Sequence, residues 1–299
     1  MDRSTRVRRR PITRPVAERG ENFSTDAKTH VRPNGEIYLP RDLGGHSDVA
    51  ALRRLAECGL FVLLSGEPGS GKTALAEAAF PDLVTVQCHG DMTVAHLLGT
   101  HLPTEDGGWR WADGPLTIAA REGLPMYLDE INSMPMDVST ILHSVMDGRD
   151  FVRIDDRPDS APVHVEPGFY VLASYNPGSL GGRRLSEALL SRFAVHIEVS
   201  TDFDAARVLG VPEELVAIAE NLVVKSDTDR GSGGRGIWTP QMRELLAARR
   251  LTEAGFDLDF AASALVSQCP WPEDVPLVID VCEHILGVRV VPLSLGNQV

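Results

Sequence analysis

The residues in this sequence most suited to chemistry lie in GEPGSGKT, residues 66–73. Glycines leave backbone N–H groups unobstructed, so such a loop can wrap a polyphosphate at the positive end of the helix that follows. The ammonium of Lys72 is expected to reach the β and γ phosphate oxygens, and the hydroxyl of Thr73 to bind Mg²⁺ directly. The chain has only three lysines against 26 arginines, so a lysine here is not filler. The residues of this loop predicted to hold a nucleotide are Gly66, Glu67, Pro68, Gly69, Ser70, Gly71, Lys72, Thr73 and Ala74.

Two adjacent carboxylates end the apolar stretch PMYLDEIN, residues 125–132. A buried strand that ends there places Asp129 and Glu130 at the carboxyl edge of a sheet, where open α/β sheets bind their ligands. Asp129 is predicted to hold a water of the Mg²⁺ shell, and Glu130 to accept a proton from an attacking water. Alone, such a pair fits solvated loop carboxylates equally well, but the phosphate loop upstream favours the catalytic interpretation.

Two further polar residues follow apolar segments. Asn176, in FYVLASYNPG, could orient the hydrolytic water beside Glu130 or sense the γ-phosphate. Alone, Asn-Pro is simply a turn signal. Arg192, in LSEALLSRF, lies between apolar residues, and a guanidinium projecting there could complete a neighbouring subunit's site as an arginine finger.

The elements that must position these residues can be read from apolar runs. Five short predicted strands alternate with helical stretches, which predicts a parallel sheet with helices on both faces. They cover residues 61–65, 83–87, 125–128, 169–174 and 195–199. A strand before the phosphate loop and a helix after it also disfavour the alternative of a glycine-rich turn without a ligand. After residue 202, apolar residues recur at helical spacing, which predicts a helical second domain.

We therefore expect a flexible basic lead over residues 1–35, an α/β domain over 36–202 and a helical domain over 203–299. A mobile glycine-rich loop is predicted at 230–236. Two hairpins are expected as well. One carries Trp109 and Trp111 on the same face, where they either grip a threaded substrate or pack on the domain's own surface. The other covers residues 151–167.

Composition and charge limit the class of protein. The chain is 43% hydrophobic and has no apolar run near the ~20 residues of a membrane span, so no membrane segment is expected. The N-terminus lacks the apolar core of a signal peptide, and four cysteines without C-x-x-C spacing fit a reducing cytosol. The cluster Cys88-His89-Gly90-Asp91 could suggest metal ligands, but a structural role is favoured because no second donor pair follows.

Charge is distributed unevenly. Residues 1–19 carry seven arginines and two acidic residues, a local charge of +5. Since the net charge of the whole chain is −13, the other 280 residues carry a charge of −18. An acidic body repels nucleic acid at long range. The arginine arm could contact phosphate or an acidic partner, or be only a solvated tail.

With these motifs in order, the chain resembles the AAA+ ATPases of the MoxR type, the group that includes CbbQ, NorQ and GvpN. The resemblance runs from about Tyr38 to Phe193 and rests on GEPGSGKT, on WRWADGPLTIAAREGLPMYLDEIN, on ASYNPG and on LSEALLSRF. It implies a five-stranded P-loop NTPase sheet followed by a small helical lid, with ATP and Mg²⁺ as cofactors. It also implies the roles of the matching residues: Walker A for 66–73, Walker B for Asp129 and Glu130, sensor 1 for Asn176 and arginine finger for Arg192.

The second sensor of the family departs from its usual pattern here. An arginine is expected to open a lid helix, but in WTPQMRELLAARRL the residue after Thr239-Pro240 is Gln241. Arg243, two places later, matches the Arg-Glu-Leu pattern of other AAA+ branches. Arg243 is therefore a candidate nucleotide-binding residue, with a solvated helix charge as the alternative.

Family members are typically hexameric rings that remodel a partner protein, often one of the von Willebrand A type. We therefore expect a cytoplasmic, Mg²⁺-dependent ATP hydrolase that forms a homo-hexamer and acts on a protein client, with metal insertion, activation or a chelatase role of the CobS type as options. A nucleic-acid motor or restriction-type subunit is the alternative, which the acidic body disfavours. A nucleotide-gated assembly module with little turnover is a third class, which Glu130 disfavours.

Overall fold

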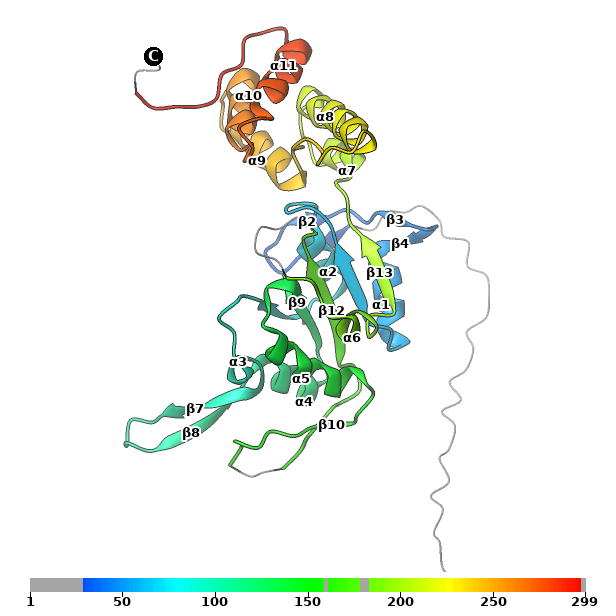
Figure 1. Cartoon of the computed structure of the whole chain (residues 1–299), viewed down its shortest axis with the longest axis vertical. Helices are drawn as coiled ribbons and strands as arrows, with labels where there is room; N and C mark the ends of the chain where they lie inside the picture. The colour runs from blue at the N-terminus through cyan, green and yellow to red at the C-terminus, as the bar shows by residue number, and fades with distance from the viewer. Residues whose placement is uncertain (1–28, 159–160, 178–182, 297–299) are drawn as a thin grey trace, which may run out of the picture.

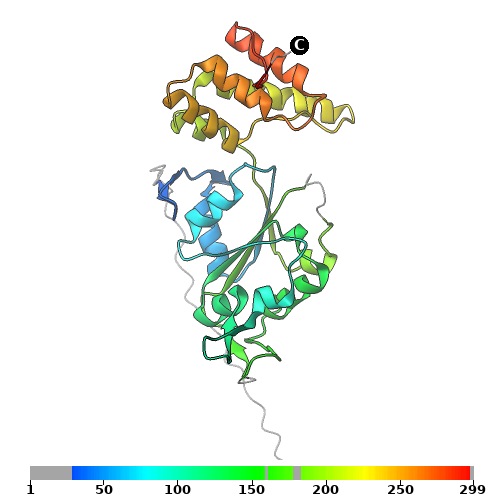
Figure 2. The ribbon, with the colours of Figure 1, turned by 90° about the vertical axis from the view of Figure 1, so that its left-hand side faces the viewer.

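The computed structural model describes residues 29–158, 161–177 and 183–296. An α/β body forms one part of the described chain and a cluster of helices the other, joined by the segment after the last strand of the sheet (Figures 1 and 2). Of the predicted basic lead only residues 29–35 are described, and the arginine-rich residues 1–19 lie outside the described chain.

A five-stranded parallel sheet forms the centre of the α/β body. Its order is β13 (Val195–Glu198), β5 (Val62–Ser65), β12 (Tyr170–Tyr175), β9 (Pro125–Asp129) and β6 (Val84–Gln87). The register places Leu172 opposite Val62 on one side and Tyr127 on the other. All five predicted strands are present, with ends shifted by about one residue, and the predicted fold class is confirmed. Strands β5, β12 and β9 end close together, so the residues that follow them meet at one edge.

Helices cover both faces because neighbouring strand residues point to opposite sides. On β9, Tyr127 packs toward α1 (Asp48–Glu57) and α2 (Lys72–Ala79), whereas Met126 and Leu128 pack toward the opposite face. The helices of that opposite face are α3 (Val94–Leu98), α4 (Pro115–Glu122), α5 (Met136–Met146) and the short α6 (Glu187–Leu190). A single 3₁₀ turn, Ile131–Ser133, follows β9. Buried strands of this kind need apolar residues on both sides, as the sequence supplies.

Within the described residues, four antiparallel hairpins are attached to the body. They are β1 (His30–Val31) with β2 (Ile37–Tyr38), β3 (Asp42–Leu43) with β4 (His46–Ser47), β7 (Gly99–Pro103) with β8 (Trp109–Asp113), and β10 (Phe151–Val152) with β11 (Val163–His164). The last two are the predicted hairpins. The two tryptophans of β8 differ in environment: Trp109 is 69% exposed, whereas Trp111 packs against the core and contacts the His101 ring edge-on at 5.1 Å. The packing interpretation therefore holds for Trp111.

The helical lid has a core of its own. It contains α7 (Phe203–Val208), α8 (Glu213–Gly231), α9 (Met242–Glu253), α10 (Leu258–Ser267) and α11 (Val275–Leu286). The side chain of Asp202 accepts a hydrogen bond from the backbone of Ala205 at 2.9 Å and so caps the first of these helices. None of the helices in the described ranges is long and apolar enough to cross a membrane.

The glycine-rich loop predicted at 230–236 is present but starts about two residues later, because helix α8 continues through Gly231. Beyond the turn, the backbone N–H groups of Gly236, Ile237 and Trp238 donate to Asp229, Ser226 and Asp274 over 3.0, 2.9 and 2.8 Å. Side chains of the lid thus hold this connection against α8 and α11.

Candidate functional site

The loop between β5 and α2 needs its glycines. A Cβ atom at Gly66, whose φ is +156°, would lie 2.2 Å from the carbonyl oxygen of Val199. Gly69 and Gly71 adopt φ values of +91° and +100°, which disfavour other residues. The loop therefore keeps its backbone close to the end of β13 and leads directly into the N-terminus of α2. This is the arrangement that binds a polyphosphate.

Lys72 is the first residue of α2 and its side chain is buried within the loop. Its Nζ donates to the carbonyl oxygens of Gly66 and Glu67 over 2.8 and 3.0 Å. Burial lowers the pKa of Lys72 to about 8, and the negative charge of Asp129 acts in the opposite direction. An ammonium that is already partly desolvated gains more than a surface lysine when an anionic oxygen replaces a carbonyl.

Thr73 and Asp129 come together as predicted. The Thr73 hydroxyl lies 3.4 Å from Oδ2 of Asp129 and 3.4 Å from the hydroxyl of Tyr127. Tyr127 donates to Oδ1 of the same carboxylate over 3.2 Å, and the hydroxyl of Ser174 donates to it as well. Two hydroxyl groups from β9 and β12 thus fix the orientation of Asp129. Burial raises the pKa of Tyr127, so its hydroxyl remains a donor.

Glu130 has an unusual backbone and two amide partners. With φ +55° it is the only non-glycine residue of the described chain with a positive φ. Such a conformation costs about 1–3 kcal/mol and is concentrated at functional sites. Asn176 donates to Oε1 of Glu130 over 3.0 Å, and Gln87 donates to Oε2 over 3.2 Å. The side-chain oxygen of Asn176 is buried and has no partner among the described residues.

A cleft of about 400 Å³ lies between the loop and the lid. Ten of the predicted site residues line it: Pro68, Gly69, Gly71, Lys72, Thr73, Ala74, Asp129, Glu130, Asn176 and Arg243. Helix α9 begins on the loop, where the backbone N–H of Arg243 donates to the carbonyl of Gly69 over 3.3 Å. Gln241 turns away and caps α9, with its Oε1 accepting from the hydroxyl of Thr201 over 2.7 Å. Of the two candidates, Arg243 is the one that reaches the cleft.

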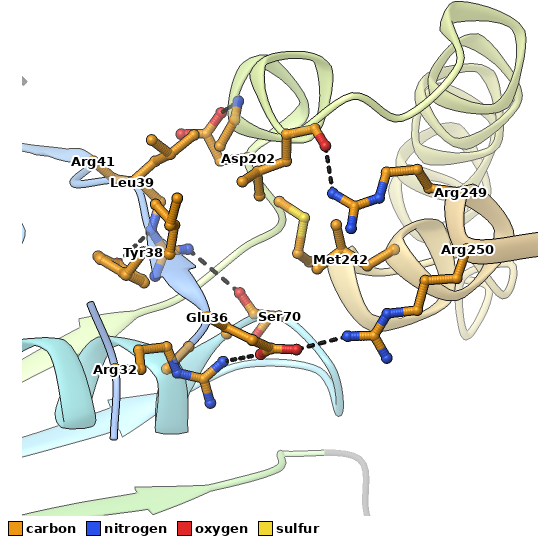
Figure 3. Close-up of a pocket in the computed structure, with 16 residues that line it drawn as sticks. Arg32, Glu36, Tyr38, Leu39, Arg41, Ser70, Asp202, Met242, Arg249 and Arg250 are labelled. Atoms are coloured by element: carbon orange, nitrogen blue, oxygen red, sulfur yellow. Dashed lines mark hydrogen bonds and ion pairs between the residues drawn. The ribbon is translucent and has the colours of Figure 1, made fainter. Parts of the chain in front are cut away.

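A second, mainly apolar pocket of about 280 Å³ adjoins the loop (Figure 3). Tyr38 and Leu39 line one side and Met242 the other, and Ala74 of α2 and Leu246 of α9 also line the pocket. A flat apolar slot beside a phosphate site suits a nucleobase. The sequence interpretation missed this pocket, because its lining residues come from four segments far apart in the chain.

Ion pairs join the segments around both cavities. Glu36 contacts Arg250 of α9 at 2.6 Å and Arg32 at 2.6 Å (Figure 3). Arg32 also contacts Glu77 of α2 at 2.7 Å. We call Glu77, Arg32, Glu36 and Arg250 the ion-pair strap. It runs from α2 through the N-terminal hairpin to the lid.

Arg41 is a further residue that the motifs did not indicate. Its guanidinium donates to the backbone carbonyl of Ser200 over 3.0 Å and approaches that of Ser70 at 3.4 Å. Its Nε donates to the Tyr38 hydroxyl over 3.1 Å. Arg41 therefore links the phosphate loop to the segment that leads into the lid. Gln87, Tyr127 and Ser174 were missed as well, although the ends of predicted strands would have pointed to the first and last of these.

Arg192 is the predicted site residue that the structure does not bring into the cleft. It follows α6 and forms an ion pair with Asp147, at 2.7 Å, on the opposite face of the sheet from the loop. No described residue of the cleft contacts it. A role for Arg192 in catalysis thus requires a second copy of the chain.

The donor set fits ATP and Mg²⁺. A hydroxyl and a carboxylate 3.4 Å apart are oxygen ligands of the kind Mg²⁺ takes, directly or through water. The hydroxyl of Ser70 in the loop is buried without a partner among the described residues, as expected where a ligand supplies one. Among the same residues, no group of three or more His, Cys, Asp or Glu could hold a metal ion by itself. Cys88 is buried, and burial raises its pKa to about 12.

Comparison with known proteins agrees with this geometry. The family model of the AAA domain (dynein-related subfamily) matches residues 61–193. Protein NorQ of Paracoccus denitrificans is 38% identical over 157 residues, 51% of this chain and 57% of NorQ. The denitrification regulatory protein NirQ of Stutzerimonas stutzeri is 37% identical over 150 residues, 49% of this chain and 52% of NirQ. Protein CbbQ of Hydrogenophilus thermoluteolus is 36% identical over 148 residues, 48% of this chain and 52% of CbbQ.

The chain thus spans about half the length of these curated relatives. The matched part contains the phosphate loop, the acidic pair, Asn176 and Arg192. Residues 61–193 thus match an AAA domain of the dynein-related subfamily, and the α/β domain of this chain is similar to NorQ, NirQ and CbbQ, which is consistent with an AAA+ ATPase of the MoxR type.

Proposed function

We propose that the chain binds Mg²⁺-ATP and hydrolyses it, with Glu130 as the general base. The observation that carries this proposal is the hydrogen bond from Asn176 to Glu130 over 3.0 Å, within the cleft that also holds Lys72 and Asp129. A carboxylate held by an amide beside a phosphate loop can accept a proton from water in line with the terminal phosphate.

Each side chain has a separate task in this proposal. Thr73 and Asp129 would hold Mg²⁺, which when bound neutralises charge on the phosphate oxygens. Lys72 exchanges its carbonyl partners for phosphate oxygens. Asn176 orients Glu130, and Glu130 takes the proton of the attacking water. Arg243 brings a positive charge from the lid to the same cleft, so nucleotide binding favours the arrangement in which the lid contacts the loop.

We further propose that the chain works as a ring, a homo-hexamer, that remodels a protein client. Two observations support this. Arg192 lies outside its own cleft, so a finger role needs a neighbouring copy. The chain without residues 1–19 carries a charge of −18, which favours a protein client over nucleic acid. A von Willebrand A-type protein, and metal insertion or activation of an enzyme, are the client and task that the MoxR-type relationship favours.

Binding and turnover can be separated by two substitutions. Lys72→Ala is expected to abolish binding of a fluorescent ATP analogue, because the loop loses its buried positive charge. Glu130→Gln is expected to keep binding and to lower kcat by about 10²–10⁴-fold, the usual contribution of a positioned base. Lys225→Ala, which removes an exposed lysine of α8, is the matched control and should change neither quantity.

The outcomes are clear-cut. If Lys72→Ala and Glu130→Gln bind and hydrolyse ATP alike, the assigned roles are wrong. The Glu130→Gln protein loaded with ATP also serves as bait, since arrested turnover retains a client. Strong, salt-sensitive stimulation of hydrolysis by DNA or RNA would replace the protein client with a nucleic acid and leave the nucleotide site standing.

A further inference from the structure

The guanidinium of Arg192 is held by two groups of the same chain, the carboxylate of Asp147 and the backbone carbonyl of Ala188. Nε donates to Oδ1 of Asp147 over 2.7 Å and Nη2 to Oδ2 over 2.8 Å. Nη1 donates to the carbonyl oxygen of Ala188, in α6. Two parallel bonds to one carboxylate fix both the position and the plane of a guanidinium. Because Asp147 ends α5 and Arg192 follows α6, the pair also joins two helices that contact each other.

Asp147 lies where a helix does not favour a carboxylate. It is the C-cap of α5, and its backbone N–H donates to the carbonyl of His143 over 3.0 Å. The carboxyl end of a helix carries partial negative charge, so a second negative charge there needs compensation. The hydrogen bond with Arg192 lowers the pKa of Asp147, and the same bond raises the pKa of Arg192. Each group thus favours the charged form of the other.

The bonds within the chain leave part of the guanidinium available. Arginine has five N–H groups. Asp147 takes one from Nε and one from Nη2, and Ala188 takes one from Nη1. No described residue accepts from the remaining N–H on Nη1 and on Nη2. The side chain of Arg192 is 21% exposed, so these two donors can meet an acceptor outside the chain.

We propose that Asp147 is a positioning residue, which holds Arg192 so that its two remaining N–H groups meet the terminal phosphate of ATP in a neighbouring copy of this chain. This inference rests on the proposed function. An unrestrained arginine loses much rotamer freedom when it is fixed at a phosphate. Arg192 is fixed before the copies meet, so its part of the site that forms between two copies is organised in advance.

Asp147→Ala tests this role. Its own cleft keeps Lys72 and Glu130, so binding of a fluorescent ATP analogue and the KM for ATP should stay close to those of the wild type. The kcat of the assembled protein should fall about 10- to 100-fold, the loss expected when a catalytic group is displaced by about 1 Å. Asp147→Asn, which keeps the size of the side chain but not its charge, provides a second variant where Asp147→Ala folds poorly.

Mixing experiments separate positioning from a purely structural role. In mixed rings of Asp147→Ala and Glu130→Gln protein, some interfaces combine an intact Glu130 with the neighbour's intact pair of Asp147 and Arg192. Hydrolysis should therefore return, as it should for Arg192→Ala mixed with Glu130→Gln. A variant that only damages the packing of α5 and α6 in its own subunit would not be rescued. Asp204→Ala is the matched control, because it removes the carboxylate of an exposed pair with Arg207 in the lid.

The possible results point in different directions. Loss of kcat with unchanged ATP binding and recovery on mixing supports the inference. Wild-type kcat in both Asp147 variants overturns it, and so does faster hydrolysis, which would show that Asp147 withholds Arg192 instead of presenting it. Loss without recovery, in oligomers shown to be mixed, also overturns it. If the wild type fails to hydrolyse ATP, or if Lys72→Ala hydrolyses equally well, the proposed function itself fails.

Discussion

Asn176 and Glu130 lie on neighbouring strand ends, and the amide of Asn176 donates to one carboxylate oxygen of Glu130 over 3.0 Å. Gln87, from the strand on the other side, donates to the second oxygen. The carboxylate is therefore held between two amide donors and lines the cleft. Removal of either amide changes the orientation of the base without touching the phosphate loop.

Asn176→Asp should be more damaging than Asn176→Ala. The new carboxylate would lie within hydrogen-bonding distance of Glu130, and two like charges at that distance raise the pKa of one of them. We expect kcat to fall about 10²-fold or more, and the acid limb of the pH profile of kcat to move to higher pH. ATP binding should change little in Asn176→Ala. Asn221→Asp, an exposed position of α8, is the control, and equal profiles for Asn176→Asp and wild type would contradict the orientation role.

Lys72 predicts opposite pH dependences for binding and stability. Burial lowers its pKa from 10.5 to about 8 in the folded chain. A polyphosphate needs the ammonium, so ATP binding above pH 8 requires uptake of a proton, and affinity should fall by up to about tenfold per pH unit. Titrations of a fluorescent ATP analogue between pH 7 and 9.5 measure this, and a flat profile would show that the lysine stays protonated.

The stability of the protein without nucleotide should move the other way. Between about pH 8 and 10.5 the unfolded chain keeps a proton at Lys72 that the folded chain has lost, so the contribution of this group to the free energy of unfolding rises with pH. Denaturant unfolding of wild type and Lys72→Met isolates that contribution. The free energy of unfolding of the wild type should rise relative to that of Lys72→Met as pH rises through this window, whereas Lys225→Met should show no such trend relative to the wild type.

Glu36→Gln should loosen the ion-pair strap. Glu36 contacts both Arg250 and Arg32, and partly exposed pairs of this kind contribute about 0.2–1 kcal/mol each. We expect dissociation of a fluorescent ATP analogue to accelerate about two- to fivefold, and the difference from wild type to shrink at high salt. Glu253→Gln, which removes the partner of Arg249 within α9, is the control. Unchanged dissociation rates in Glu36→Gln would show that the lid is held by other contacts.

The two tryptophans of β8 should separate in their effect on stability. Trp111 packs on the core and donates from Nε1 to Asp113 over 2.6 Å, so Trp111→Ala should lower the free energy of unfolding by about 2–3 kcal/mol. Trp109 is exposed, and Trp109→Ala should change it by no more than about 0.5 kcal/mol. Denaturant unfolding checks both. Equal losses of stability in the two variants would contradict the difference between the two tryptophans. If a client stimulates hydrolysis, Trp109→Ala also tests whether this hairpin binds the client.

Local sequence determined much of what could be predicted. The glycine spacing of residues 66–73 predicts the loop conformation from eight consecutive residues. The apolar runs predict the strand ends to within about one residue. Because parallel strands end at a common edge, Thr73 and Asp129 had to approach each other. These inferences need no knowledge of the rest of the molecule.

The parts that could not be predicted depend on where distant segments dock. Glu36 reaches Arg250 only because the N-terminal hairpin and α9 lie on either side of the cleft. The choice between Arg243 and Gln241 depends on the cap of α9, where Gln241 turns toward Thr201. The placement of a lid on a loop is a tertiary property, and the spacing of residues along one helix does not contain it.

The order of strands in the sheet also has a consequence during translation. Strands β5 and β9 do not pair with each other, since β12 lies between them, and β12 starts only at residue 170. A nascent chain that ends earlier carries its phosphate loop on a strand that has no neighbour in the sheet. At about 5–20 residues per second, the interval between β5 and β12 lasts on the order of 5–20 s. During that time the ribosome-bound chain exposes unpaired strand edges, and a cell that makes this protein must shield them from other chains.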